Sequence, residues 1–386
     1  MAGLPMEGLR QLRESTFTAF SNLIDYALET KPDFVMIVGD IYDGDDRSLR
    51  AQLKFQEGMK KLHEVGIPVF ISYGNHDHLS GKWTRFELPQ NVHVFDGEVG
   101  QTELIVRGQE VVIHGFSYKE RHISEAMIAH FPVAETREAI HIGMLHGSIA
   151  GDASHAVYAP FTKEGLLAKR YDYWGLGHIH LRQQLHVEPP IVYPGNIQGR
   201  HRNEQGLKGF YDVELSKSTA ELTFMPTSAI VFERLDVSCA GIRHANEWFE
   251  ACLAVIDGFK AMYPAGIIEL TMTDIDQDAG DLFQQSTEQE WLDVLREYIG
   301  EEESFYWVHN ILFAQPPVDQ IVSNALTASV KNTMENWTEV DWKDVLKDVY
   351  QHVRGVKYLD VLTPSDIEEI QVEAEKILAT EMSEMK

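Results

Sequence analysis

The sequence contains little cysteine and no long apolar stretch. Its 386 residues include two cysteines, Cys239 and Cys252, too few for a cysteine-based metal cluster or a disulfide framework. The low number of cysteines fits a reducing compartment such as the cytoplasm. No apolar run approaches the roughly 18 to 20 residues needed to cross a bilayer, and the start, MAGLPMEGLRQLREST, shows no apolar segment of a secretory signal. We therefore expect a cytoplasmic chain with no membrane partner.

Positive charge is also scarce. The chain carries 33 Lys and Arg against 60 Asp and Glu, a net charge of −27, and residues 229–386 alone hold 11 basic against 31 acidic side chains. This excludes a free-standing electrostatic DNA binder, which carries a basic face. A polyanionic substrate must instead be held locally, by metal ions and a few arginines, or by a partner protein. The acidic C-terminal part predicts a solvated surface or a protein-docking region.

The hydrophobic residues, 44% of the chain, suffice for a core and for two or three domains. Residues 7–30 show helical spacing, and the apolar run 33–40 predicts a buried strand of a parallel sheet. A second helix is expected over residues 48–66 and a second strand over residues 67–72. The order strand, helix, strand indicates an α/β fold.

After residue 90 the predicted strands follow one another closely, which suggests two sheets packed face to face with helices outside. The pattern changes near Met225-Pro226. We expect one domain over residues 1–228, a small α/β domain over residues 229–315, and a helical region over residues 316–386. The amphipathic helices of this last region either pack on the body or dock a partner.

Polar residues follow four of the predicted strands. The four motifs are Gly39-Asp40-Ile41-Tyr42-Asp43, Gly74-Asn75-His76-Asp77, Leu145-His146-Gly147 and Gly177-His178-Ile179-His180. In open α/β sheets ligands bind beyond the carboxyl ends of the strands, so these motifs are expected to converge. Taken singly, each is a common turn, cap or structural histidine. Their joint occurrence favours a metal site.

The residue types indicate which metal. A carboxylate, an amide oxygen and imidazoles suit borderline ions such as Mn²⁺ or Fe²⁺ better than Ca²⁺. A carboxylate such as Asp40 can bridge two ions about 3.5–4 Å apart, the spacing used for in-line phosphoryl displacement. Alternation along a strand turns His178 and His180 to the same side, so that one histidine can serve each ion.

The motifs GDIYD, GNHD, LHG and GHIH, in this order, resemble those of the calcineurin-like metallophosphoesterases. The segments VGDIYDGDDRSLRAQ and YPGNIQGRHRNEQGLKGFYDVEL are similar to the SbcD-type nucleases, and among these to the bacterial YhaO-type DNA repair exonuclease family. The resemblance covers about residues 8–228. It implies an α/β double-sheet sandwich flanked by helices, followed by a small α/β capping domain and a helical C-terminal region.

The resemblance also implies metal-binding roles. Asp40 is the bridging ligand, and Asp43 supports the site. One ion's shell is completed by Asn75, His146 and His178, and His180 belongs to the second ion.

The remaining implied roles concern the substrate. His76 is the general acid, or orients the scissile phosphate, and Asp77 orients His76. Three residues after YPGN either contact the DNA backbone or form a solvated loop: Arg200, His201 and Arg202.

The function expected from this resemblance is metal-dependent hydrolysis of DNA phosphodiester bonds, as an exonuclease or endonuclease in DNA repair, by a two-metal mechanism with Mn²⁺. The implied partners are DNA, an SMC-like coiled-coil ATPase subunit and a second copy of the chain. Two alternatives stay open: a non-catalytic scaffold of the ATPase complex, and a phosphodiesterase of small substrates.

One family motif has no counterpart in the sequence. The family carries an Asp-x-His motif on a strand just before the first helix, whereas no Asp-x-His precedes Leu9 here. We expect truncation rather than loss of the site. As written, the sequence supplies one nearly full ion shell and half of another, which predicts a weakly active or inactive two-metal nuclease.

Overall fold

The computed structural model describes residues 4–42, 48–81, 86–135, 138–150, 158–299 and 305–313, with a few single residues beyond. The chain up to Ala314, apart from residues 152–156, forms one compact unit, and the remainder forms a second. The helical region predicted for residues 316–386 lies almost entirely outside the described residues. None of the helices in the described ranges combines the length and the apolar character that crossing a bilayer requires.

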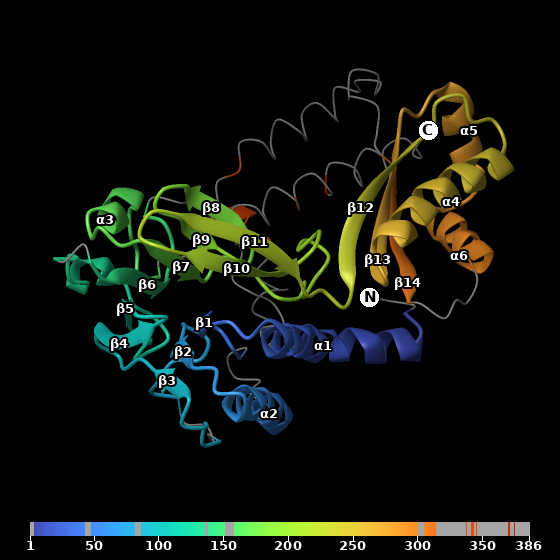
Figure 1. Cartoon of the computed structure of the whole chain (residues 1–386). Coiled ribbons are helices and arrows are strands. Elements are labelled where there is room, and N and C mark those ends of the chain that lie inside the picture. The colour runs from blue at the N-terminus through green and yellow to red at the C-terminus, as the bar shows by residue number, and fades with distance from the viewer. Residues whose placement is uncertain are drawn as a thin grey trace. The chain divides into compact units, whose positions relative to one another are not determined.

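The N-terminal part alternates helices and parallel strands, as the sequence predicts (Figure 1). Ser48 caps the second helix by accepting the N–H of Ala51. The elements in chain order are α1 (Met6–Thr30), β1 (Val35–Val38), α2 (Leu49–Glu64), β2 (Val69–Ser72) and β3 (Val92–Val94). The three strands form a parallel sheet in the order β1-β2-β3. The helices α1 and α2 cover one face of it, where Ile24 and Met59 pack against Ile71.

A six-stranded sheet follows, in the order β4-β5-β6-β7-β9-β8. Its strands are β4 (Gly100–Val106), β5 (Gln109–Gly115), β6 (Ile140–His146), β7 (Tyr173–Gly177), β8 (Gln183–His186) and β9 (Ile191–Tyr193). The central strands β5, β6 and β7 are parallel. All seven residues of β6 are buried, which is the pattern of a strand covered on both faces.

The main core lies between the two sheets. Phe70 of the three-stranded sheet packs with Met144 and Val192 of the six-stranded sheet. The outer face of the six-stranded sheet buries Leu145 and Trp174 beneath the segment that contains η2 (Met127–His130) and α3 (Lys163–Leu167). The predicted double-sheet sandwich flanked by helices is therefore confirmed.

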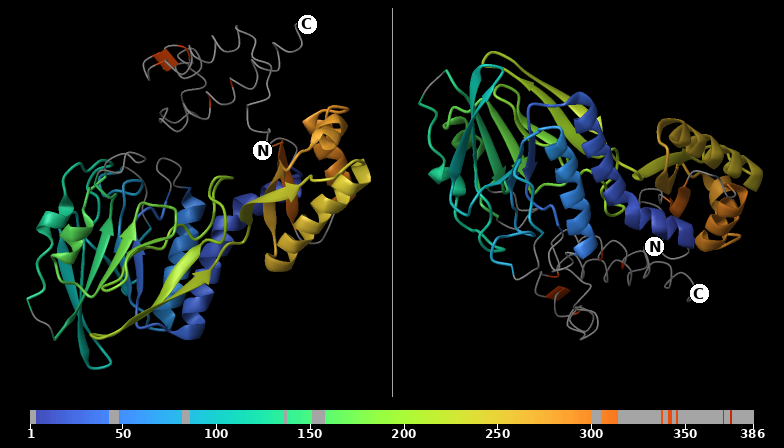
Figure 2. Two further views of the ribbon diagram at one scale, coloured as in Figure 1. Left: turned by 90° about the horizontal axis from the view of Figure 1, so that it is seen from above. Right: turned by 60° about the horizontal axis from the view of Figure 1, so that its bottom comes forward.

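A hairpin and a second α/β layer complete the described unit (Figure 2). The hairpin pairs β10 (Gly209–Leu215) with β11 (Ala220–Pro226). The parallel sheet β12-β13-β14 follows, with helices packed on one of its faces. Its elements are β12 (Val231–Ser238), α4 (Ala245–Met262), β13 (Gly266–Thr273), α5 (Gln277–Phe283), α6 (Glu288–Ile299) and β14 (Tyr306–Phe313). Strands and helices alternate through this segment, which agrees with the α/β character expected of residues 229–315.

A small apolar cluster joins the second layer to the first helix. Leu12 of α1 packs against Phe232 of β12 and Ile267 of β13. The backbone N–H of Gly206 donates to the carbonyl of Phe232. The double-sheet part and the β12-β13-β14 part thus belong to one compact unit. Their division into separate domains at residues 228 and 315 stays a prediction.

Candidate metal centre

The four polar motifs lie at the carboxyl ends of four strands in the two facing sheets. Strand β1 is parallel to β2, and β6 is parallel to β7, so the residues that follow each pair leave the sheet at the same edge. Asp40 follows β1, and Asn75 follows β2. His146 ends β6, and His178 follows β7.

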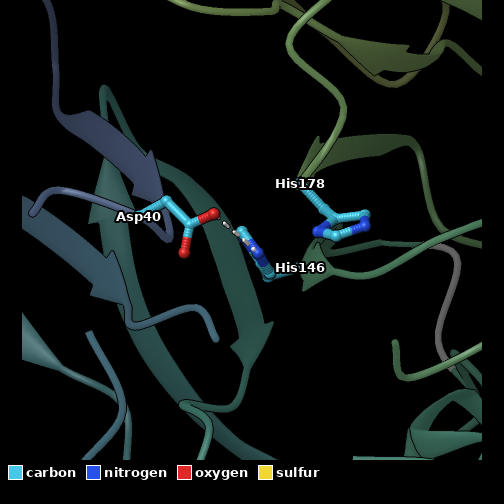
Figure 3. Close-up of side chains that lie close together, drawn as sticks. All are labelled: Asp40, His146 and His178. Carbon is cyan, nitrogen blue, oxygen red and sulfur yellow. Dashed lines mark ion pairs between the residues drawn. The ribbon is translucent and has the colours of Figure 1, made fainter. Parts of the chain in front are cut away.

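The side chains of Asp40, His146 and His178 point toward one another (Figure 3). One potential ligand atom of each lies within 4.8 Å of the others. The Nε2 atom of His146 is 3.3 Å from Oδ2 of Asp40. The Oδ1 atom of Asn75 lies 2.8 Å from Nε2 of His146 and 3.3 Å from Nδ1 of His178. The structure thus brings together the four residues predicted to hold one ion.

Glycine is required where the backbone approaches these ligands. A Cβ atom at Gly74 would meet Oδ1 of Asp40 and would lie 2.6 Å from Cε1 of His146. A Cβ atom at Gly177 would meet the carbonyl of Val38 and lie 2.7 Å from Nδ1 of His146. The glycines in the motifs therefore leave the space that the donor atoms occupy.

Two of the ligand candidates have an unusual backbone conformation. Asp40 has a φ of 51° and His178 a φ of 98°, values that side chains other than glycine rarely adopt. Such residues cost about 1–3 kcal/mol each and cluster at functional sites. The fold therefore holds both donors in place against a local conformational preference.

Asp77 ties the first two motifs together. Its side chain is fully buried, and its carboxylate accepts three backbone N–H groups. Oδ1 accepts from Gly74 at 2.5 Å and from Asp40 at 3.2 Å, and Oδ2 accepts from Ile41 at 2.7 Å. These contacts fix the loop after β1 against the loop after β2. The expectation that Asp77 orients His76 stays a prediction.

The electrostatics of the centre favour an ionised Asp40. Burial raises the pKa of Asp40, but the neighbouring His146 and the N–H of His76 outweigh burial and hold the pKa well below its usual range. Burial, together with the negative charge of Asp40, raises the pKa of Asp77 to about 6. A cation bound at Asp40 would offset the repulsion between the two carboxylates.

His76 lies beside the donors. Its backbone N–H donates to Oδ1 of Asp40 at 3.0 Å, and its side chain is half-buried. The charge of His76 also helps to lower the pKa of Asp40. The structure thus places the predicted proton donor at the edge of the metal centre, partly accessible to a substrate.

His180 is held by a residue that the sequence motifs do not include. Among the described residues, it is not part of the close group formed by Asp40, His146 and His178. Its Nδ1 atom lies 2.7 Å from Oε1 of Glu204, a carboxylate that is 8% exposed. One signal in the sequence could have indicated Glu204: it is an acidic residue within an otherwise basic loop, although that pattern is also typical of a solvated turn.

The predicted substrate loop surrounds Glu204. The backbone N–H of Arg200 donates to Oε2 of Glu204 at 2.7 Å, and Nε2 of His201 lies 3.5 Å from Oε1. Arg202 lines a small cavity with Phe232, Glu269 and His309. Arg200 and His201 therefore lie close to the carboxylate that binds His180, whereas Arg202 lies at the separate cavity. Asp43, predicted to support the site, lies outside the described residues.

The donor set fits a divalent ion. One carboxylate oxygen, one amide oxygen and two imidazole nitrogens converge, which is a combination suited to borderline first-row ions. Nε2 of His146 contacts both Asp40 and Asn75, so a cation at this point would meet oxygen donors on two sides. Among the described residues, no cysteine contributes to it.

Comparison with known proteins agrees with this geometry. The model of the calcineurin-like phosphoesterase family matches residues 13–182. The uncharacterized metallophosphoesterase YhaO of Bacillus subtilis is 32% identical over 98% of this chain and 93% of its own length. The DNA double-strand break repair protein Mre11 of Methanocaldococcus jannaschii is 27% identical over 63% of this chain and 66% of its own length.

Another Mre11, from Thermoplasma acidophilum, is 26% identical over 55% of this chain and 60% of its own length. The match to YhaO extends over nearly the whole of both proteins, and the family match spans all four strand-end motifs up to His180. The resemblance predicted from the motifs is thus confirmed, and the chain belongs to the calcineurin-like phosphoesterase family, whose members are hydrolases that use divalent metals.

Proposed function

We propose that the chain is a metal-dependent nuclease that hydrolyses DNA phosphodiester bonds in DNA repair. The observation that carries the proposal is the convergence of Asp40, Asn75, His146 and His178 at the ends of four strands. The Mre11 relatives, named as DNA double-strand break repair proteins, support the choice of DNA as the substrate.

The cofactors in this proposal are two divalent ions, and Mn²⁺ is the metal favoured by the donor set. Asp40, Asn75, His146 and His178 would hold the first ion, and Asp40 and His180 would contribute to the second. When bound, the ions neutralise phosphate charge and lower the pKa of water for attack. The protein's own contribution is to place these donors and to fix them through Asp77 and the close-packed glycines.

His76 supplies the proton in this proposal. Its backbone is anchored to Asp40, while its half-buried ring stays at the accessible edge of the centre. An imidazole in that position can protonate the leaving oxygen or donate a hydrogen bond to the scissile phosphate.

Substrate binding is assigned to Arg200, His201 and Arg202. The chain carries a net charge of −27 and therefore repels duplex DNA overall, so DNA binding requires a local basic surface. These three residues follow one another in the loop that surrounds Glu204, next to His180. By the resemblance, the small α/β segment over residues 229–315 would cap the centre and contribute to DNA binding.

The partners in this proposal are an SMC-like coiled-coil ATPase and a second copy of the chain, in the cytoplasm. The buried, unpaired thiols of Cys239 and Cys252 support a reducing compartment. The acidic excess of residues 229–386 supports a docking role for that part of the chain. Mixing the chain with the ATPase subunit and measuring co-elution tests the first partner.

Hydrolysis assays test the activity. We expect slow, Mn²⁺-dependent degradation of linear duplex DNA, because the donors of this chain complete one ion shell. The Asp40→Asn variant should lose Mn²⁺ binding by about 100-fold or more and lose the hydrolysis, since removal of even an outer-shell partner costs 10–100-fold. The exposed Asp25→Asn variant on α1 is the matched control and should behave like the unmodified chain.

The same assays separate the alternatives. Hydrolysis of bis(p-nitrophenyl) phosphate without hydrolysis of duplex DNA would favour a phosphodiesterase of small substrates. Tight binding of the ATPase subunit without metal binding or hydrolysis would favour a scaffold. Either result would overturn the nuclease assignment.

A further inference from the structure

The loop after β9 encloses a buried carboxylate that no metal-site motif contains. Glu204 is 8% exposed, and both of its oxygens are engaged. Oε1 lies 2.7 Å from Nδ1 of His180. Oε2 accepts from the backbone N–H of Arg200 at 2.7 Å and from Nδ2 of Asn196 at 3.0 Å.

The same loop also holds the backbone of His180. The N–H of Asn196 donates to the carbonyl of His180 at 3.1 Å. A Cβ atom at Gly195 would lie 2.6 Å from that carbonyl, and Gly195 has a φ of 78°. Asn196 therefore bridges the main chain of His180 and the carboxylate that binds its ring. This closed network leaves the imidazole little freedom to rotate.

The contact with Glu204 also selects the tautomer of His180. An ionised carboxylate only accepts hydrogen bonds, so Nδ1 of His180 must carry the hydrogen. The other oxygen of Glu204 already accepts from Arg200 and Asn196, so Oε1 is the oxygen that accepts from His180. The neutral ring then has its lone pair on Nε2. The His180 side chain is 45% exposed, so the ring is not sealed in by the loop.

We propose that Glu204 is a positioning residue for the metal centre, which orients His180 and fixes the tautomer that presents Nε2 to the second divalent ion. Carboxylates that accept the other N–H of a metal-bound histidine have this effect in metalloproteins. The role in metal binding rests on the proposed function, whereas the orientation and tautomer of His180 do not. Glu204 also contacts His201, so one carboxylate links the ion-binding histidine to the predicted substrate loop.

Glu204→Gln is the informative variant, because an amide cannot satisfy this network in the same way. The backbone N–H of Arg200 can only donate, so the new amide oxygen must occupy the position of Oε2. The amide NH₂ then faces Nδ1 of His180, which has to accept. The hydrogen of the imidazole moves to Nε2, and the nitrogen that the ion needs is blocked. We expect about 10–100-fold weaker binding of an ion at His180.

Nitrogen NMR of imidazole-labelled chain measures the tautomer directly. The His180 signals are assigned by their loss in His180→Gln. Before metal is added, the unmodified chain should show Nδ1–H, and Glu204→Gln should show Nε2–H. The matched control is Glu269→Gln, another buried glutamate, whose carboxylate binds Arg234 and Asn310. This control should leave the His180 signals unchanged.

Titration with Zn²⁺, which is diamagnetic, then tests the link to the metal. In the unmodified chain the Nε2 signal of His180 should shift, and in Glu204→Gln that shift should be lost while His146 and His178 still respond. If His146 and His178 do not respond in the unmodified chain, the proposed function fails, and the tautomer still decides the orienting role of Glu204.

Three outcomes would overturn the inference. The first is an Nε2–H tautomer in the unmodified chain, which needs no variant and decides the question even if Glu204→Gln does not fold. The second is an unchanged tautomer in folded Glu204→Gln. The third is a response of His146 and His178 to Zn²⁺ without any response of His180 in the unmodified chain.

Discussion

The carboxylate of Asp77 accepts the backbone N–H of Ile41 at 2.7 Å and so ties the loop after β1 to the loop after β2. The two loops carry Asp40 and Asn75, which come from different strands and must meet at one ion. Three N–H groups converge on this carboxylate. Asp77 thus acts on the ligands through the backbone, which distinguishes it from the ligands themselves.

Asp77→Asn should destabilise the fold by about 1–3 kcal/mol. The amide oxygen can replace Oδ1, but the NH₂ group then faces the N–H of Ile41 and leaves a buried donor unsatisfied. Chemical denaturation measures the loss. The control is Asp96→Asn, whose exposed carboxylate accepts one N–H, from Gly97. Equal effects of the two substitutions would show that the three-way contact of Asp77 has no special role.

The strands and the metal ligands can be predicted from the sequence because each produces a recognisable pattern within a short segment. Buried parallel strands are continuous apolar runs, and ligands follow them at their carboxyl ends. Asp40, Asn75, His146 and His178 could be found in this way. The positive φ of Asp40 and His178 has no such signal, because only the assembled loops impose it.

The contacts of Asp77 and Glu204 could not be predicted for a related reason. Asp77 accepts the N–H of Ile41, and Glu204 binds the ring of His180, so each contact joins segments that are distant in sequence. A Glu in the sequence RHRNEQG is typical of an exposed turn, yet the structure buries its side chain. Hydrophobic periodicity describes elements that bury apolar faces, and it carries no information on polar groups that turn inward.

Binding of Mn²⁺ should stabilise the chain, because the donors converge in the folded state alone. At a free Mn²⁺ concentration of 100 times the dissociation constant, the expected gain is about 2.7 kcal/mol. Thermal denaturation with and without Mn²⁺ measures it, and a chelator should reverse it. The shift should disappear in His146→Gln and persist in His63→Gln, which alters an exposed histidine of α2. A shift that survives in His146→Gln would place the ion elsewhere.

Stability should fall in acid partly through a buried histidine pair on β5 and β6. His114 is 2% exposed, its Nε2 atom lies 3.1 Å from Nδ1 of His141, and its ring stacks on Tyr171. Burial, together with the charge of His141, lowers the pKa of His114 from 6.5 to about 4. The folded state therefore favours the neutral ring.

The sign of the pH dependence follows from this shift. Below pH 6.5 His114 becomes protonated in the unfolded chain but stays neutral in the folded chain. The free energy of unfolding therefore falls as the pH drops toward 4, and then levels off. The total contribution is about 3 kcal/mol. His114→Phe keeps the stacking on Tyr171 and should flatten the dependence between pH 6.5 and 4. Exposed His63→Phe is the control, and an equally steep dependence in His114→Phe would contradict the assignment.

Gly74→Ala should weaken Mn²⁺ binding by more than about 10-fold, although every donor remains. The new Cβ atom would meet Oδ1 of Asp40 and lie 2.7 Å from Nε2 of His146, so the two ligands must separate. Calorimetric titration of the folded variant measures the affinity. Gly258→Ala in α4 is the matched control, because a Cβ atom there has no neighbour within 4 Å. Alanine should even stabilise that helix by about 0.5–1 kcal/mol. If Gly74→Ala binds Mn²⁺ as tightly as Gly258→Ala, the close approach of the backbone to these ligands is not what sets the geometry of the site.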